Sequence, residues 1–319
     1  MAGEMTGTSR QGIFKIEGTR GTYGAPDYST DFNVTVFDLA DVNIDAGHTG
    51  GNNGANGTFG KTKSLAGRKQ SPIEFMTAIR SNPDIAVAPV WWKFLEACGW
   101  VVDETGLNAT ATWDGRPSCK SLSGDFPLWG CGIDPTGEAD VLAGMAGTVE
   151  FGAEEVGGEI KAKFTFTGKA GNPKTLNAGT FTTPSGEDAQ DGQTYLGVSL
   201  VKGSKTYKAW TWTVAQNADV QSVNNSADVT NGASTGIDYF NVVNAEPSAS
   251  FSATRITTNT DVVDMFTNVV ETSLVITMDH FELTLSEGVQ DVAVSRETQN
   301  ETATDSINVK FNKMVLKQI

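Results

Sequence analysis

The segment Ala139–Lys169 contains two stretches in which apolar and polar residues alternate with a period of two. The first stretch ends near Phe151, the second begins at Ile160, and the residues between them are typical of a turn. Successive side chains of a strand point to opposite sides, so this pattern predicts an antiparallel hairpin with one apolar and one polar face. We expect the apolar face to lie on a core and the polar face to meet water.

Alternation also predicts strands over residues 13–17, 31–45 and 71–80. A short helix is expected after Pro89, which is typical of a first turn, and before Gly99, which is typical of a helix end. The apolar face of this helix consists of Val90, Trp91, Phe94, Leu95 and Cys98. We expect that face to cover a sheet, with the tryptophans as core residues rather than a ligand platform.

Composition restricts the class of protein. The chain has 319 residues, enough for two domains of ordinary size. No apolar run approaches the ~18 residues that a membrane-spanning helix requires, so no membrane partner is expected. The formal net charge of -15 excludes a surface that binds nucleic-acid phosphates tightly. The first residues lack the pattern of a secretory signal, so we expect synthesis in a cytoplasm.

No residue pattern predicts catalysis. Gly60, Lys61 and Thr62 resemble the end of a phosphate-binding loop, but Ala55 stands where that loop requires glycine. The 3 cysteines form no C-x-x-C pair, and the 2 histidines lie in no recognisable catalytic setting. We therefore expect reduced thiols, no catalytic residues, no metal site, no cofactor and no enzyme activity.

The second half of the chain repeats the pattern of the first. The corresponding segments are 34–39 and 208–214, the loops 46–70 and 217–236, the strands 72–80 and 247–258, the helices 90–98 and 261–271, and the strands 160–165 and 307–312. Phe251 corresponds to Phe75 (251 - 75 = 176), and Lys310 corresponds to Lys163 (310 - 163 = 147). Internal repeats of this size indicate a duplicated domain.

The chain is therefore expected to contain four regions. They are an N-terminal arm over 1–30, a first domain over 31–169, a linker over 170–197 and a second domain over 198–319. Within the first domain, the loop 46–70 is unusually long and rich in Gly and Asn. Long loops in compact domains are often functional, so an interaction role is expected for it.

Short motifs in the first half carry a family resemblance. They are Leu65-Ala66-Gly67, Phe94 to Gly99, Gly147-Thr148-Val149 and Lys163 to Gly168. In its order of strand, long loop, strand, helix and hairpin, the chain resembles the major tail tube protein of long-tailed, siphophage-type bacteriophages, with the tube domain duplicated. The resemblance implies a mainly β fold with one short helix per repeat. It implies two tube-type β-sandwich or split-barrel domains whose sheets form a continuous oligomeric barrel.

The function implied by this resemblance is structural. Rings of the chain would stack into a tail tube whose acidic lumen conducts double-stranded DNA during ejection without binding it tightly. Implied partners are further copies of the chain, a tape measure protein, and tail tip and terminator proteins. The implied location is the virion, after assembly in the host cytoplasm. Three chains per ring are expected, each supplying two sectors, and six chains with the second domain outside are the alternative.

Two sets of residues follow from the resemblance. The lumen candidates are Glu74, Glu150, Glu159, Lys161, Lys163, Ser248, Ser250, Ser252 and Thr254. The candidates for contacts between rings are Tyr23, His48, Asn52, Phe59 and Lys61. A competing interpretation is a two-domain β virion protein that binds a receptor or carbohydrate, and exposed aromatic side chains would favour it.

Overall fold

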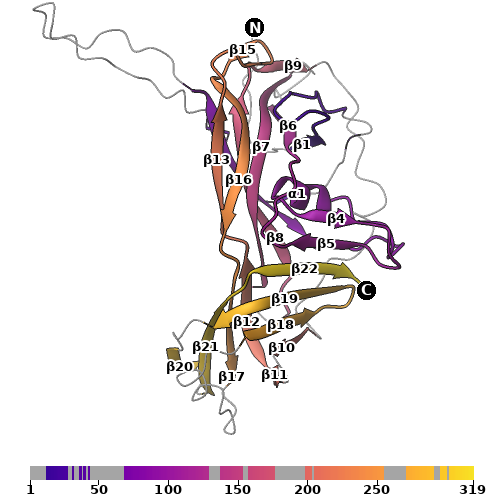
Figure 1. Cartoon of the computed structure of the whole chain (residues 1–319), viewed down its shortest axis with the longest axis vertical. Coiled ribbons are helices and arrows are strands. Elements are labelled where there is room, and N and C mark those ends of the chain that lie inside the picture. Colours follow the sequence, from indigo (N-terminus) through magenta and orange to yellow (C-terminus); the bar gives the residue numbers. More distant parts are fainter. Residues whose placement is uncertain are drawn as a thin grey trace, which may run out of the picture.

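The structure is a computed structural model of the chain (Figure 1). It describes residues 12–27, 31, 36–37, 39–40, 42–43, 68–128, 137–153, 157–176, 198–202, 205–254, 271–290, 295–299 and 302–319. In this part the chain is mainly β, as predicted, and α1 (Trp92–Ala97) is the one α-helix among the described residues.

Strands occur throughout both halves. Those of the first half are β1 (Ile13–Ile16), β2 (Val36–Phe37), β3 (Gln70–Ala78), β4 (Val101–Asp103), β5 (Thr110–Trp113), β6 (Leu122–Leu128), β7 (Gly137–Ala153), β8 (Lys161–Ala170) and β9 (Lys174–Leu176). Those of the second half are β10 (Ser199–Lys202), β11 (Lys205–Tyr207), β12 (Ala209–Ala215), β13 (Ala218–Asn224), β14 (Val229–Thr230), β15 (Ala233–Ser234), β16 (Ile237–Ala245), β17 (Ser248–Thr254), β18 (Glu271–Thr277), β19 (Phe281–Gln290), β20 (Ser295–Gln299), β21 (Thr302–Lys310) and β22 (Lys313–Gln318).

The central hairpin forms between β7 and β8, and its prediction is confirmed. Val149 lies opposite Phe164, and Gly147 lies opposite Phe166, in antiparallel register. Val149 and both phenylalanines are buried, whereas Glu150 is exposed. The pairing requires glycine at position 147, because a Cβ there would lie 2.4 Å from both Cδ1 of Phe166 and the backbone oxygen of Thr165. A larger residue would therefore displace that ring.

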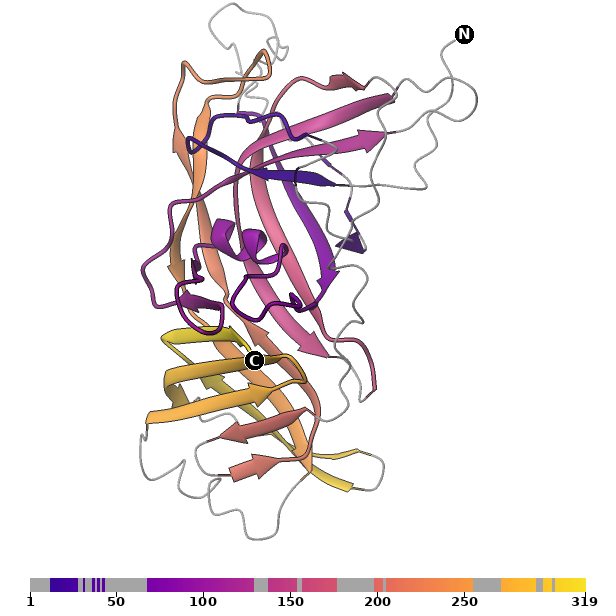
Figure 2. The same ribbon diagram turned by 90° about the vertical axis from the view of Figure 1, so that its right-hand side faces the viewer.

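Aromatic side chains from β3, β8 and α1 form the core of the first half. The ring centroids of Phe75 and Phe94 are 5.0 Å apart, and those of Phe94 and Phe164 are 5.2 Å apart. Trp91 is buried with its ring centroid 6.4 Å from that of Phe151, and its Nε1 donates to the backbone oxygen of Arg80 at 2.8 Å. Figure 2 shows α1 against these strands. The predicted helix therefore covers the sheet, and the neighbouring tryptophans are core residues, as predicted.

The strand pairing of the first half recurs in the second. In the first half β1, β6, the start of β7 and β9 are paired in that order, and β2, β3, β8 and the end of β7 form a second series. In the second half β10, β18, β19 and β22 match the first series, and β12, β17, β21 and β20 match the second. Here β19 and β20 together take the place of the long β7. Each half therefore has the same antiparallel arrangement.

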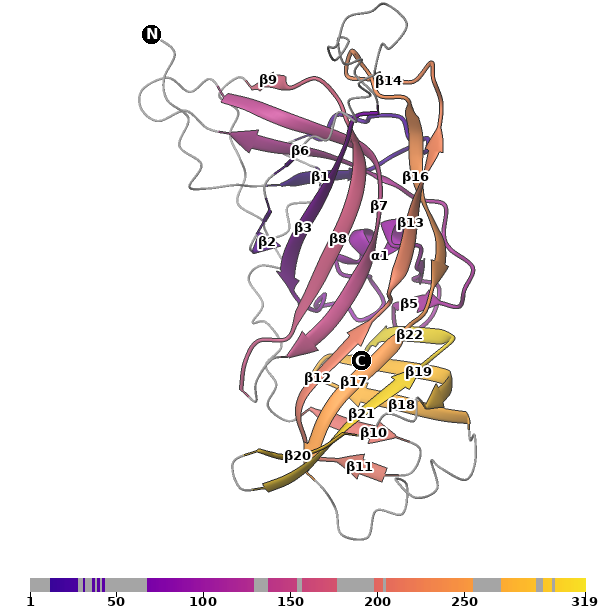
Figure 3. The ribbon, with the colours of Figure 1, turned by 90° about the vertical axis from the view of Figure 1, so that its left-hand side faces the viewer.

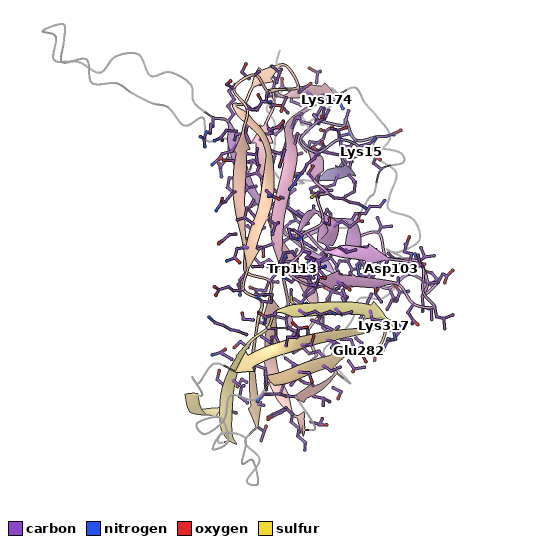
Figure 4. All side chains as sticks on the ribbon, viewed as in Figure 1. Lys15, Asp103, Trp113, Lys174, Glu282 and Lys317 are labelled. Carbon is purple, nitrogen blue, oxygen red and sulfur yellow. The ribbon has the colours of Figure 1, made fainter. Side chains whose placement is uncertain are left out.

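The two halves join where the end of β7 pairs with β12. Gly152 lies opposite Thr213 in this antiparallel ladder. As a result β2, β3, β8, β7, β12, β17, β21 and β20 form one continuous series of eight strands, seen from one side in Figure 3. A second ladder joins β5 to β22, where Trp113, labelled in Figure 4, lies in the register opposite Met314.

The predicted N-terminal arm over 1–30 is wrong for residues 12–27. Phe14 is buried in the core, and β1 pairs with β6. Glu17 is also buried, and its carboxylate accepts a hydrogen bond from the backbone N–H of Gly144 at 2.7 Å. These residues therefore belong to the folded first half, because they supply both a strand and core contacts. Residues 1–11 lie outside the described part.

The predicted loop over 217–236 is also wrong. It contains β13 and the small ladder of β14 with β15, and β13 pairs with β16 over its full length. The side chains of β13 are exposed or half-buried. A strand without a buried face lacks the apolar alternation that identifies strands in sequence, so the sequence pattern did not predict β13.

Other boundaries shift as well. The linker predicted over 170–197 starts too early, because β8 ends at Ala170 and β9 then pairs with β7. Residues 177–197 lie outside the described part. Of the strand predicted over 31–45, only β2 is described as a strand. The helix predicted over 261–271 lies outside the described residues except for Glu271, which begins β18.

One alignment between the repeats must also move. Phe75 lies opposite Phe164, and Phe251 lies opposite Ile307. If Phe75 corresponds to Phe251, then Phe164 corresponds to Ile307, at an offset of 307 - 164 = 143 rather than 147. The alignment of Lys163-Phe164 with Lys310-Phe311, which rested on their similarity, is therefore shifted by four residues from the structural correspondence.

Candidate functional surface

One face of the eight-strand series is polar. Along β3, β8 and β17, alternate residues are buried and the residues between them are mostly half-buried or exposed. α1 packs on the buried side, which faces the viewer in Figure 2 and lies behind the sheet in Figure 3. The opposite side is termed the polar face. Its residues on the six central strands include Glu74, Met76, Thr148, Glu150, Lys161, Lys163, Thr165, Thr167, Thr211, Thr213, Ser248, Ser250, Ser252, Thr254, Ser306, Asn308 and Lys310.

The polar face brings the predicted lumen residues of both halves together. Glu74, Glu150, Lys161, Lys163, Ser248, Ser250, Ser252 and Thr254 belong to it, and Glu159 adjoins it next to the turn. Thr213 connects the two sets, because it lies opposite Gly152 of β7 and Ser250 of β17. Thr211 and Thr213 were missed as candidates, although the alternation in residues 208–214 places them on one side of a strand.

Two lysines of the polar face, Lys163 and Lys310, lie beside glutamates. Nζ of Lys163 is 2.9 Å from Oε1 of Glu74, and Glu150 lies directly opposite Lys163 in register. The hydrogen bond to Glu74, with a smaller contribution from the charge of Glu150, raises the pKa of Lys163. In the second half, Nζ of Lys310 is 3.5 Å from Oε2 of Glu246. The described polar face is therefore mixed in charge, although the whole chain carries a net charge of -15.

A depression with a volume ≈ 550 Å³ lies on the polar face where β7 meets β12. It is lined by Met76, Glu150, Gly152, Ala153, Gly158, Glu159, Lys161, Lys163, Thr211 and Thr213. The charged side chains of the first half gather around it, whereas β17 presents only the hydroxyl side chains of serine and threonine. The polar face thus has a charged part in the first half and a hydroxyl-rich part in the second.

The hairpin of β13 and β16 fastens the second half to the first. Nζ of Lys169 on β8 is 2.8 Å from Oδ1 of Asp228, between β13 and β16, and the lysine side chain is fully buried. Nη2 of Arg20 donates to the backbone oxygen of Phe240 at 3.0 Å, and its guanidinium carbon lies 4.3 Å from the ring centroid of Tyr239. The hairpin is therefore held to residues of the first half by charged groups at two places.

Buried Gln216 adds a third contact, between β12 and the core of the first half. Its Nε2 donates to the backbone oxygen of Cys98 at 2.7 Å, and its Oε1 accepts from Nε1 of Trp100 at 3.3 Å. Its backbone N–H donates to the oxygen of Val149 at 2.9 Å. Because buried polar groups need partners, this side chain fixes the position of β12 against α1 and β7.

The eight-strand series ends in β2 on one side and in β20 on the other. Among the described strands, β2 pairs with β3 alone and β20 pairs with β21 alone. In the repeat, β2 corresponds to β12, and β20 corresponds to the end of β7. β12 and the end of β7 are the strands that pair with each other at the junction of the halves. The sides of β2 and β20 that pair with no other described strand are termed their free sides, and they correspond to the two sides of a contact that already exists within the chain.

Of the residues predicted to make contacts between rings, only Tyr23 belongs to the described part of the chain. Tyr23 contributes to the fold, because its hydroxyl donates to Oδ1 of Asp125 at 2.7 Å. The candidates outside the described residues are His48, Asn52, Phe59 and Lys61. Of the loop predicted over 46–70, residues 68–70 are described, and Gln70 already belongs to β3.

The sequence matches no protein-family model, and it matches no curated protein. No helix in the described part of the chain combines the length and apolar character that crossing a membrane requires. A function must therefore be inferred from the geometry of the chain itself.

Proposed function

We propose that this chain is the building block of a bacteriophage tail tube. Three copies close into a ring, the rings stack, and the polar faces line a channel through which double-stranded DNA passes. The observation that carries this proposal is the correspondence between the free sides of β2 and β20 and the two strands paired at the β7–β12 junction. A chain with such edges can repeat its internal contact between copies.

Ring closure follows from strand direction. The eight strands of the series are paired antiparallel throughout. Because eight is an even number, β2 and β20 run in opposite directions, and β20 of one copy can pair antiparallel with β2 of the next. Head-to-tail contacts of this kind close into a ring when the rotation between copies is an integral fraction of a turn. Closure would also pair the two end strands of the eight-strand series, and unpaired sheet edges otherwise favour aggregation.

The size of the closed barrel suits the proposed cargo. Three copies of eight strands give 3 × 8 = 24 strands. With a strand spacing of about 4.8 Å and a tilt of about 40°, such a barrel has a backbone diameter of about 48 Å. This diameter leaves room for duplex DNA after side chains have been added.

Three chains per ring are favoured over six. The alternative of six chains places the second half outside the tube as an appendage. In the structure Ser250 and Ser252 lie on the same polar face as Glu150, because both halves contribute to one continuous sheet. This continuity supports a ring in which each chain supplies two sectors of the wall.

The remaining parts of the proposal follow from the tube. The partners are further copies of the chain, a tape measure protein inside the tube, and tip and terminator proteins at its ends. DNA is a passenger without tight binding, and no catalytic role is assigned. The chain assembles in the host cytoplasm and resides in the virion.

A receptor- or carbohydrate-binding virion protein is the second candidate. Exposed aromatic side chains would favour it. Trp91, Trp92, Trp100, Trp113 and Trp212 are buried. Their burial favours the tube, since carbohydrate recognition by aromatic rings requires accessible ones.

Electron microscopy of the purified protein in negative stain tests the proposal. Long filaments of uniform width with a central channel are expected, because each ring exposes surfaces for the next. A protein that remains monomeric at high concentration and binds host cells would instead favour the receptor-binding candidate.

A further inference from the structure

The polar-face lysines and their glutamate partners suggest how a wall with lysines can avoid holding DNA. Lys163 lies between Glu74 on β3 and Glu150 on β7, and its ammonium group is 2.9 Å from the carboxylate of Glu74. The side chain of Lys163 is 37% exposed and that of Glu74 is 47% exposed. The pair is thus accessible to a passing polyanion.

The second half contains the same kind of pair. Lys310 at the end of β21 is 3.5 Å from Glu246, which lies just before β17. Lys310 occupies a polar-face position, because it lies opposite Ser248. The two pairs use different strands and do not correspond in the repeat, so each half has its own arrangement of a lysine beside a glutamate.

The chemistry of these pairs bears on phosphate binding. A lysine binds DNA because it neutralises a phosphate and releases a condensed counterion. A carboxylate at hydrogen-bond distance occupies one of the three N–H donors of the ammonium group and repels an approaching phosphate. A lysine paired in this way therefore contributes apolar side-chain length and one compensated charge, but little phosphate affinity.

We propose that Glu74 masks Lys163 and that Glu246 masks Lys310 from DNA phosphates, so that these two lysines do not act as phosphate-binding sites on the channel wall. This inference rests on the proposed function for its biological setting, since only a channel gives DNA regular access to this face. At these two positions the wall then neither holds DNA nor repels it strongly.

The test measures binding of a short fluorescent DNA duplex to the unassembled chain at several salt concentrations. In Glu74→Gln the isosteric amide removes the charge that masks Lys163. This variant is expected to bind the duplex several-fold more tightly than wild type at low salt. The logarithm of its affinity should fall more steeply with the logarithm of salt concentration, by about 0.9 for one additional phosphate contact.

Two controls isolate the masked lysine. Glu282→Gln makes the same change in net charge away from the polar face, at a glutamate that lies opposite Lys317 in register but forms no ion pair with it in the described part of the chain. Figure 4 labels Glu282 and Lys317 on the right of the view. The polar face is on the left of that view and is turned toward the viewer in Figure 3. Glu282→Gln should leave DNA affinity unchanged. In the double variant Glu74→Gln with Lys163→Gln, the gain should be lost.

The outcomes separate this inference from the proposed function. A gain in Glu74→Gln no larger than in Glu282→Gln, or a gain that persists without Lys163, would overturn the masking role. If the gain is observed but wild-type protein forms no tubes, the masking role stands and the tube is refuted. If tubes form and the gain is absent, the tube stands and the masking role is refuted.

Discussion

Lys169 and Asp228 form a 2.8 Å ion pair in which the lysine side chain is fully buried and the aspartate side chain is 13% exposed. Lys169 belongs to β8 in the first half, and Asp228 lies between β13 and β16 in the second. Oδ2 of Asp228 also accepts a hydrogen bond from the hydroxyl of Thr235 at 2.6 Å. The pair therefore joins the two halves through groups that have little contact with water.

Lys169→Ala is expected to lower the free energy of unfolding by about 3 kcal/mol, because removing one partner of a buried pair leaves the other charge without compensation. Denaturant unfolding followed by circular dichroism measures this change. The matched control is Lys310→Ala, which breaks the ion pair with Glu246. The side chains of Lys310 and Glu246 are 59% and 67% exposed. Exposed pairs contribute about 1 kcal/mol or less. Equal losses in both variants would show that Lys169 does not fasten the halves.

Gly21→Ala should destabilise the chain more than Gly115→Ala. Both glycines have positive φ, +76° at Gly21 and +79° at Gly115, so alanine at either position costs roughly 1–2 kcal/mol in backbone strain. A Cβ at Gly21 would also lie 2.3 Å from the backbone oxygen of Asp238, whereas Gly115 has no atom within 4 Å. The additional overpacking is expected to cost at least about 1 kcal/mol.

Thermal or denaturant unfolding of these two glycine variants tests the contact between the turn after β1 and β16. Indistinguishable stabilities would contradict it, since backbone strain alone would then account for both changes. The comparison needs no assumption about assembly, because both residues belong to the same chain.

Cys98 is expected to resist alkylation in the native protein. Burial raises the pKa of the Cys98 thiol well above its ordinary value, so the thiol stays protonated at pH 8, and the thiolate is the reactive form. Cys119 is exposed. Iodoacetamide at pH 8 followed by peptide mass spectrometry should find Cys119 modified and Cys98 intact, with both modified in denaturant. Equal modification in the native state would contradict the burial of α1 against the sheet.

Sequence patterns predicted the parts of the fold that have one buried face. The alternation around Val149 and Phe164 predicted the central hairpin, and the spacing of Trp91 and Phe94 predicted α1 with its buried side. These patterns are reliable because burial selects apolar residues at the period of the element. The same rule placed the lumen candidates of each half on polar sides of strands.

Features that depend on distant parts of the chain could not be predicted in this way. Glu17 lies in a segment that looks like an arm, and its burial depends on partners such as Gly144, more than a hundred residues away. The ladder that places Gly152 opposite Thr213 leaves no local pattern, because it depends on how the two halves dock. Pairing of Glu74 with Lys163 required the register between β3 and β8.

The central claim is that copies of this chain repeat their internal junction to close a ring of three. Cryo-electron microscopy of filaments formed by the purified chain tests it most directly. The expected reconstruction has three chains per ring, β20 of each chain paired antiparallel with β2 of the next, and Glu150 and Ser250 both facing the channel. Six chains per ring with the second half projecting outward, or rings in which the edges of β2 and β20 remain unpaired, would contradict the account.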